Sequence, residues 1–298
     1  MPLKSFKANL LPEVKELNLP VKKNILSSAY SGELASNIKG GGIEFEDYRE
    51  YSVTDDAARI DWRASKRSQR LLVREYKIEV NFTVFFIIDV SETMLFGSTK
   101  KLKCEYAAES IASLFHGLLM SGNAVGYALF SDHVTKMLKP MLGRRQFHVF
   151  SKDISNPKNY GGKKDIGKAF QQAMQLLDRK SLVFIISDFL GMDDNWKEYF
   201  KILSSKHEVI GIMIRDPVDM ELPDVKCQLV IGDPNSSNTM YVDSSDYRKI
   251  YKEYNEKQYL LVNALFQQNR STLMLLKTTQ PSLHTLMQYF RKKGARWR

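Results

Sequence analysis

The segment that decides the fold is Thr83-Val84-Phe85-Phe86-Ile87-Ile88-Asp89-Val90-Ser91-Glu92-Thr93. Its first six residues are all β-branched or aromatic, a pattern typical of a strand buried on both faces inside a parallel sheet. The run ends at an acid, which is followed by hydroxyl residues at positions 91 and 93. Ligands of open α/β sheets bind outside the carboxyl ends of such strands. The segment therefore predicts a central strand with a polar site at its end.

Predicted strands and helices alternate along the rest of the chain. Strands are expected over residues 82–89, 124–130, 181–188, 208–214 and 271–277, and helices over residues 101–121, 143–151, 165–177, 193–205, 243–268 and 281–291. Alternation of this kind predicts an α/β fold, with a doubly wound and mostly parallel sheet that carries helices on both faces. We place this domain at residues 81–298 and an N-terminal appendage at residues 1–80.

The composition excludes several classes of protein. The 298 residues are 43% hydrophobic, which is enough for an ordinary globular core, and two cysteines suggest neither a disulfide framework nor a zinc site. No apolar run is long enough to span a bilayer, and the first twenty residues mix lysine and glutamate with leucine, unlike a signal peptide. We expect a soluble, cytoplasmic protein with no membrane partner.

The net charge of +10 is unevenly distributed. Residues 134–168 hold nine Lys or Arg and two acids, and residues 278–298 hold five Lys or Arg and no acid. Such segments bind nucleic acid, a membrane surface or an acidic protein, or simply form a solvated face and a basic tail. No recognition-helix, zinc or aromatic RNA-binding motif supports nucleic-acid binding, which remains an alternative function.

Asp188 is the expected partner of Asp89, because it too follows an apolar strand. Two carboxylates in one crevice repel unless a cation or protons separate them. Carboxylates and hydroxyls are the hard oxygen ligands that Mg²⁺ or Mn²⁺ prefers. Asp89, Ser91, Thr93 and Asp188 are therefore the candidate metal ligands. The alternative is that each acid only caps a neighbouring helix N-terminus or loop amides.

The string Asp89-x-Ser91-x-Thr93 resembles the metal-ion-dependent adhesion site of von Willebrand factor A-like domains, which have a Rossmann-like fold. In those domains a threonine from a glycine-rich loop usually supplies a further oxygen. The matching loop here is residues 161–166, and Lys164 stands where that threonine would be. An ammonium cannot ligate a cation and makes a nearby one less favourable, so weak Mg²⁺ or Mn²⁺ binding is expected at best.

This departure leaves two alternatives open. Lys164 could itself neutralise Asp89 or Asp188 and make the site metal-free, or Asp165 could supply the missing oxygen. Lys163, Lys164 and Asp165 form the expected rim. In the adhesion mechanism an acidic side chain of the partner completes the coordination of the ion, and with Lys164 present the ammonium could hold that carboxylate directly.

A second cluster lies before the sheet. It comprises Gly42-Ile43-Glu44-Phe45-Glu46-Asp47-Tyr48-Arg49-Glu50-Tyr51 and Asp55-Asp56-x-x-Arg59-Ile60-Asp61-Trp62-Arg63. Arginine forks, carboxylates and aromatic rings suit a partly buried network that holds the appendage onto the sheet, or else a docking surface.

Together with the turn at residues 89–94, this cluster closely resembles the prokaryotic domain-of-unknown-function family fifty-eight. The resemblance implies a von Willebrand factor A-like domain without catalytic activity. It also implies association with a MoxR-type AAA+ ATPase, as an adaptor in the assembly or maturation of a protein client.

The main rival is a metal-dependent phosphatase or hydrolase that uses Asp89, because Asp89 ends a central strand as the nucleophile of an aspartate-dependent phosphatase does. That chemistry generally needs a second acid two residues later as the proton donor, and position 91 is serine. A near match to a phosphate-binding loop at residues 162–169 ends in Ala169 and so lacks the Mg²⁺-binding hydroxyl. We therefore expect a non-enzymatic protein-interaction adaptor.

Overall fold

The computed structural model describes residues 3, 5–10, 43–52, 57–78, 83–225, 228–232, 239–281, 285, 286 and 288. The chain divides into two compact units, one formed by residues 25–81 and the other by residues 1–24 together with 82–298. The larger unit holds the predicted α/β domain.

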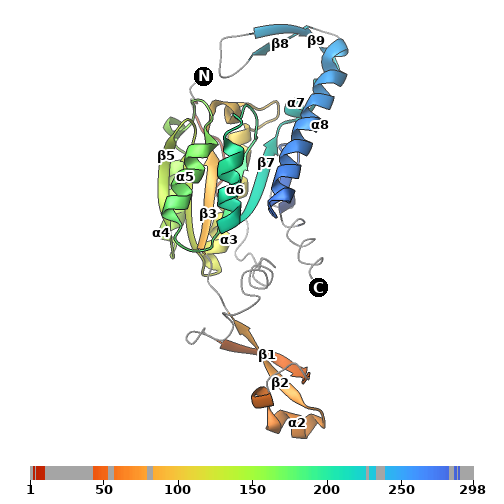
Figure 1. Ribbon diagram of the computed structural model, residues 1–298. Coiled ribbons are helices and arrows are strands. Elements are labelled where there is room, and N and C mark those ends of the chain that lie inside the picture. The colour runs from red at the N-terminus through yellow and green to blue at the C-terminus, as the bar shows by residue number, and fades with distance from the viewer. Residues whose placement is uncertain are drawn as a thin grey trace. The chain divides into compact units, whose positions relative to one another are not determined.

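A six-stranded sheet in the order β10-β7-β6-β3-β4-β5 forms the centre of the larger unit (Figure 1). Its strands are β3 (Thr83–Asp89), β4 (Ala124–Phe130), β5 (Val134–Met141), β6 (Leu182–Ser187), β7 (Glu208–Arg215) and β10 (Thr272–Lys277). All neighbouring strands are parallel except β5, which is antiparallel to β4. The predicted doubly wound, mostly parallel α/β sheet is confirmed.

Strand β5 was not predicted, because its sequence does not read as a core strand. It carries two lysines and Pro140, and none of its residues is buried. Proline cannot donate to a ladder and is found in sheets at edges, which is where β5 lies.

Helices cover both faces of the sheet, as expected (Figure 1). The helices of this unit are α3 (Lys103–Met120), α4 (Arg145–Ile154), α5 (Ile166–Leu176), α6 (Trp196–Lys206), α7 (Pro217–Met220) and α8 (Ser244–Gln268), with short 3-10 turns at η3 (Glu92–Leu95) and η4 (Pro157–Asn159). Helices α5, α6 and α8 share one hydrophobic core with the sheet, in which Phe200 of α6 packs on Phe266 of α8. On the other face, α3 and α4 pack through the stacked rings of Phe115 and Phe150.

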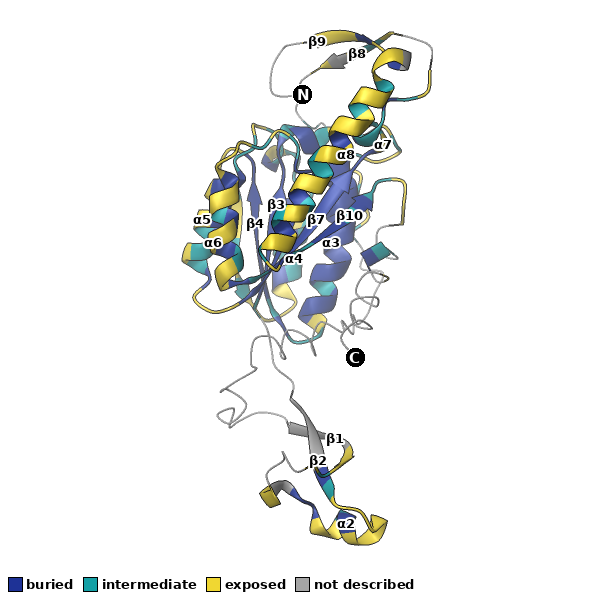
Figure 2. Ribbon diagram, turned by 45° about the vertical axis from the view of Figure 1, so that its right-hand side comes forward, coloured by how far each residue is buried: buried dark blue, intermediate teal, exposed yellow. Residues whose placement is uncertain are grey.

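The central strands are buried almost completely (Figure 2). Every residue of β6 is buried, as is every residue of β3 after Thr83. The predicted central strand and its partner therefore lie side by side, with Ile88 opposite Ile186. Their carboxyl ends meet at one edge of the sheet, which places the candidate site there.

Two further segments complete the larger unit. Strands β8 (Gln228–Gly232) and β9 (Thr239–Asp243) form an antiparallel hairpin that the sequence did not predict. At the N-terminus, the backbone nitrogens of Lys7 and Asn9 donate to Glu105 and Glu109 of α3, at 2.6 and 2.9 Å. Residues of the predicted appendage thus lie on the α/β unit. The closing helix expected at residues 281–291 falls mostly outside the described residues.

The smaller unit pairs β1 (Ile43–Glu50) with β2 (Leu72–Ile78) and adds a 3-10 turn η2 (Ala57–Arg59) and helix α2 (Trp62–Ser68). Asp61 caps α2 by accepting from the backbone nitrogens of Arg63 and Ala64, and Tyr48 donates its hydroxyl to the same carboxylate. Trp62 is 67% exposed. Asp61 and Tyr48 of the cluster therefore stabilise the local fold of this unit.

In the part of the chain that the structure describes, no helix combines the length and the hydropathy that crossing a membrane requires.

Candidate functional site

The candidate site begins where β3 and β6 end. Asp89 is the last residue of β3. On the adjacent strand β6, Ser187 is the last residue, and Asp188 directly follows the strand. Ser187 donates its hydroxyl to Asp89 Oδ2 at 2.5 Å, and the backbone nitrogen of Ser91 donates to Asp89 Oδ1 at 2.9 Å. Asp89 and Asp188 are 1% and 0% exposed. The two predicted carboxylates therefore do meet at this edge, and both are cut off from solvent.

The ammonium of Lys164 lies between the two acids. Its Nζ is 2.9 Å from Asp89 Oδ2, forms an ion pair with Asp188 Oδ1, and donates to the carbonyl oxygen of Leu190 at 3.0 Å. The Lys164 side chain is 1% exposed. The residue that departs from the adhesion-site pattern thus places one positive charge between the two carboxylates and forms a charge-assisted contact with each.

The loop of residues 160–165 positions Lys164. Gly161 and Gly162 have φ angles of +119° and +85°, which residues with a Cβ rarely adopt. Gly161 donates its backbone N–H to the carbonyl of Val90, and the N–H of Glu92 donates to the carbonyl of Gly162. These bonds hold the loop against the segment that follows β3. The side chain of Lys164 extends from this loop to Asp89 and Asp188.

A second buried lysine contacts the other side of Asp188. Lys103, the first residue of α3, places Nζ 2.8 Å from Asp188 Oδ2 and 2.9 Å from Asp219 Oδ2. Asp219 lies in α7, directly after β7, and its Oδ2 also accepts the backbone N–H of Asp216 at 3.0 Å. Asp89, Asp188, Asp219, Lys103 and Lys164 form one connected set of buried ion pairs, which we call the charge network.

The remaining predicted residues take other positions. Ser91 and Thr93 are buried and share a hydrogen bond of 3.2 Å between their hydroxyls. Asp165 caps α5 by accepting a hydrogen bond from the backbone N–H of Lys168. Its carboxylate also forms an ion pair with Lys168 Nζ at 3.0 Å. Its carboxylate is therefore engaged with Lys168 here, and its use as a replacement oxygen stays a prediction. Lys163 is exposed, so its ammonium is the one of the two rim lysines that faces solvent.

These contacts do not fit a divalent cation. Lys164 already contacts one oxygen of each carboxylate, and Lys103 contacts the second oxygen of Asp188. A cation added beside two ammonium groups would meet strong repulsion in a buried site. Within the described ranges, no three His, Cys, Asp or Glu side chains are grouped as metal ligands. The residues fit the metal-free alternative, and a titration with Mg²⁺ or Mn²⁺ tests it against the weak binding that the sequence allows.

Burial and charge act against each other throughout the network. Burial of Asp188 is the largest influence and opposes ionisation, but the ammonium groups of Lys164 and Lys103 outweigh it and hold the pKa of Asp188 well below its usual range. Burial likewise lowers the pKa of Lys103, and the carboxylates of Asp188 and Asp219 together raise it above the ordinary lysine value. Both groups are therefore charged at neutral pH.

A family model described as "Protein of unknown function DUF58" matches residues 47–259 of the chain. The chain belongs to the DUF58 family. The resemblance read from the sequence is thereby confirmed at the level of the family, whereas association of this DUF58 protein with a MoxR-type ATPase stays a prediction.

Two mycobacterial relatives bear the name "Uncharacterized protein". Proteins of Mycobacterium tuberculosis and Mycobacterium bovis are each 28% identical over 218 residues, which cover 72% of this chain and 68% of theirs. Among solved structures, a conserved hypothetical protein BatB from Bacteroides thetaiotaomicron is similar with a TM-score of 0.49 and 15% identity, over 72% of this chain and all of that one. A von Willebrand factor type A protein from Catenulispora acidiphila gives a TM-score of 0.40 and 12% identity, over 75% and 43% of the two chains.

Sequence reasoning did not assign a role to Lys103, Asp219 or Ser187. A lysine at the start of a helix reads as a solvated residue, and only the packing of α3 against the strand ends buries it. One available signal was the acid pair Asp216 and Asp219 directly after β7, since β7 ends at the same sheet edge as β6.

The charge network predicts how stability depends on pH. The folded-state pKa of Asp188 lies below the unfolded value of about 3.9, so its contribution is complete above that pH and is lost as pH falls through the folded pKa. The pKa of Lys103 is raised, so its contribution is complete below the unfolded value of about 10.4 and is lost as pH rises through the folded pKa. We expect urea denaturation between pH 3 and 10 to show a loss of stability at the acid end. Lys103→Met should show a shallower acid loss, and an identical slope would contradict the assignment.

Proposed function

We propose that this DUF58 protein is a non-enzymatic protein-interaction adaptor in which a lysine ammonium takes the place of the adhesion-site cation. The observation that supports this most strongly is the position of Lys164, buried and in contact with both Asp89 and Asp188. The ammonium places one positive charge where a divalent ion would place two, and it is part of the chain. The arrangement of loops at this edge is therefore independent of metal concentration.

The same contacts argue against the hydrolase alternative. A nucleophilic or basic carboxylate must reach its substrate. Asp89 is 1% exposed, and its two oxygens already accept hydrogen bonds from Ser187 and Ser91 as well as contacting Lys164. A substrate cannot approach Asp89 without displacing this network.

The burial of Lys164 also changes where a partner would bind. Because its side chain is 1% exposed, a partner carboxylate cannot reach the ammonium directly. Lys163, on the loop that Lys164 anchors, carries an exposed positive charge at this edge. We propose that an acidic side chain of a MoxR-type AAA+ ATPase, or of a protein client shared with it, contacts this rim.

Charge reversal at the rim tests the proposal. Lys163→Glu should slow association with a purified MoxR-type ATPase by roughly 2- to 10-fold, because a rim charge mainly acts through steering and modest surface pairing. Biolayer interferometry at low and high salt measures the association rate constant. The matched control is Lys180→Glu, an exposed lysine that precedes β6 and so lies at the opposite edge of the sheet.

Binding that is equally weakened by both reversals would show that only net charge matters. Binding unaffected by Lys163→Glu but abolished by Arg296→Glu in the basic tail would place the docking surface elsewhere. Turnover of a phosphate ester that disappears in Asp89→Asn would contradict the non-enzymatic assignment.

A further inference from the structure

Helix α8 exposes a row of large apolar side chains. Tyr247, Ile250, Tyr254 and Leu261 are each between 51% and 72% exposed. Successive members are 3, 4 and 7 residues apart, a spacing that puts side chains on one face of a helix. Apolar residues scattered singly over a surface need no explanation, but a contiguous exposed row marks a site of interaction. We call this row the α8 stripe.

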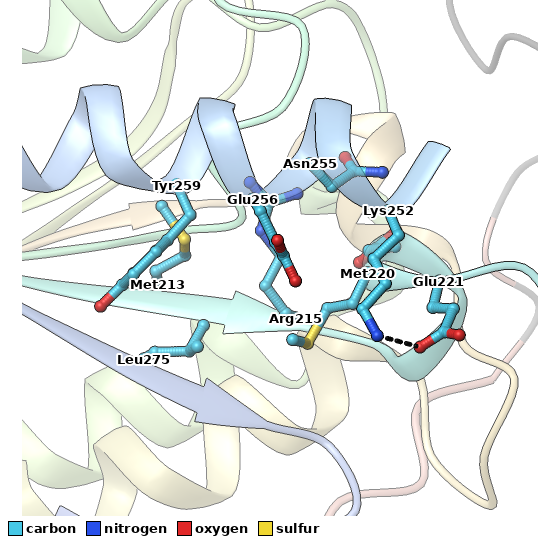
Figure 3. Close-up of a pocket in the computed structure, with 10 residues that line it drawn as sticks. Met213, Arg215, Met220, Glu221, Lys252, Asn255, Glu256, Tyr259 and Leu275 are labelled. Carbon is cyan, nitrogen blue, oxygen red and sulfur yellow. Dashed lines mark ion pairs between the residues drawn. The ribbon is translucent and has the colours of Figure 1, made fainter. Parts of the chain in front are cut away.

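Other faces of α8 are used within the fold. Val262 and Phe266 are buried in the hydrophobic core that α8 shares with α5 and α6. Lys252 and Glu256 lie on the side of α8 that faces β7 and β10, where they line a pocket together with Tyr259 (Figure 3). Among the described residues, no member of the α8 stripe belongs to this core or to this pocket. The stripe is therefore not what holds α8 on the sheet, and exposed residues recur along the whole helix (Figure 2).

The charges of α8 are nearly balanced, unlike those of the whole chain. The helix holds four basic and three acidic residues, whereas the chain has a net charge of +10. Glu253 and Lys257 are exposed within one turn of Tyr254, and neither forms an ion pair in the part of the chain that the structure describes. A stripe with one nearby charge of each sign does not select a strongly acidic or strongly basic partner. It is complementary to a second copy of itself.

We propose that α8 pairs in antiparallel orientation with α8 of a second copy, about a two-fold axis at Tyr254. An interface of this kind must be self-complementary, because both copies use the same surface. Tyr247 and Leu261 are each seven residues from Tyr254, so Tyr247 of one copy lies against Leu261 of the other. Lys257 of one copy then lies within about one helical turn of Glu253 of the other. The dimer does not use the rim that the proposed function assigns to a partner.

The size of the α8 stripe predicts a weak dimer. The stripe spans residues 247–261, which is about 21 Å of helix. One helix pair of this length buries less than the roughly 1,600 Å² of a standard interface, so we expect a dissociation constant of about 1–100 μM. Monomer and dimer are therefore both populated at concentrations that sedimentation velocity covers.

Sedimentation velocity of the full chain from about 1 to 200 μM tests the proposal, and the wild type should change from monomer to dimer over this range. Tyr254→Glu should raise the dissociation constant at least about 10-fold, because it places two carboxylates at the two-fold axis and removes a central apolar contact. Tyr254 is 68% exposed, so the variant should still fold. The matched control is Met141→Glu, at the end of the edge strand β5, where the residue is 60% exposed. It should dimerise as the wild type does.

A mixture of Glu253→Lys chains and Lys257→Glu chains tests whether these charges meet between copies. Each variant alone brings like charges together at both contacts, whereas the mixed dimer pairs opposite charges at both. The mixed dimer should therefore be at least about 5-fold tighter than either homodimer. Lys249→Glu, an exposed change on the same helix outside the stripe, should show no such preference when it is mixed with Glu253→Lys.

A monomer at every concentration would leave the α8 stripe to a different protein and would overturn the proposal. A dimer that Tyr254→Glu leaves unchanged, or that Met141→Glu weakens equally, would overturn it too. Mixed chains that show no preference for each other would exclude the antiparallel pairing of α8. Lys163→Glu should leave the dimer intact, so failure of this proposal and failure of the adaptor proposal are distinguishable.

Discussion

Replacing Lys103 by methionine is expected to lower the free energy of unfolding by about 3–5 kcal/mol. The substitution keeps an unbranched side chain, one atom shorter, but removes an ammonium that contacts both Asp188 and Asp219. Asp188 would keep Lys164, whereas among the described residues Asp219 forms an ion pair only with Lys103. A buried carboxylate that loses its partner carries its full desolvation cost, which is why breaking one side of a buried pair costs more than the pair contributes.

Urea denaturation at pH 7 measures this effect. The control is Lys101→Met, two residues earlier, where a lysine that is 44% exposed pairs with Glu109 and should contribute no more than about 1 kcal/mol. A Lys103→Met, Asp219→Asn double variant should be more stable than the sum of the single changes predicts, because the two groups share one ion pair. Equal small losses for Lys101→Met and Lys103→Met would contradict the description of the network.

Lys164→Thr is expected to have two opposite effects that depend on metal. Without divalent cations it should destabilise the fold by about 3–5 kcal/mol, because Asp89 and Asp188 lose the ammonium between them. It also restores the hydroxyl that the adhesion-site pattern has at this position. Mg²⁺ or Mn²⁺ should then stabilise the variant, by about 2.7 kcal/mol at a free concentration of 100 times Kd.

Thermal denaturation with EDTA and with increasing Mg²⁺ measures both effects. Lys163→Thr is the matched control, since it changes the preceding, exposed lysine of the same loop. It should show neither the loss nor the recovery. A Lys164→Thr variant as stable as wild type in EDTA would mean that the ammonium does not neutralise the acids.

Much of the fold could be predicted because its signals are local. The apolar run before Asp89 and the similar run before Asp188 identify two strands buried on both faces, and their burial follows from composition alone. The edge strand β5 could not be predicted in the same way, since none of its residues is buried and its lysines resemble a solvated segment.

The candidate site was predictable only in part. The meeting of Asp89 and Asp188 follows from strand order, and the replacement of threonine by Lys164 is visible in the sequence. Whether Lys164 contacts the two acids depends on the conformation of the loop that contains Gly161 and Gly162. No local sequence pattern specifies that conformation. The contact of Lys103 with Asp188 joins residues 85 positions apart in the chain, so only the folded packing of α3 reveals it.

The most direct test of the ammonium-for-cation account is a titration of the wild-type protein with Mn²⁺, followed by isothermal calorimetry and by the melting temperature. Because Lys164 and Lys103 already neutralise the carboxylates, we predict no saturable binding of Mn²⁺ at millimolar concentration and no change in melting temperature. Saturable binding of one Mn²⁺ per chain that raises the melting temperature and is lost in Asp89→Asn would contradict the account.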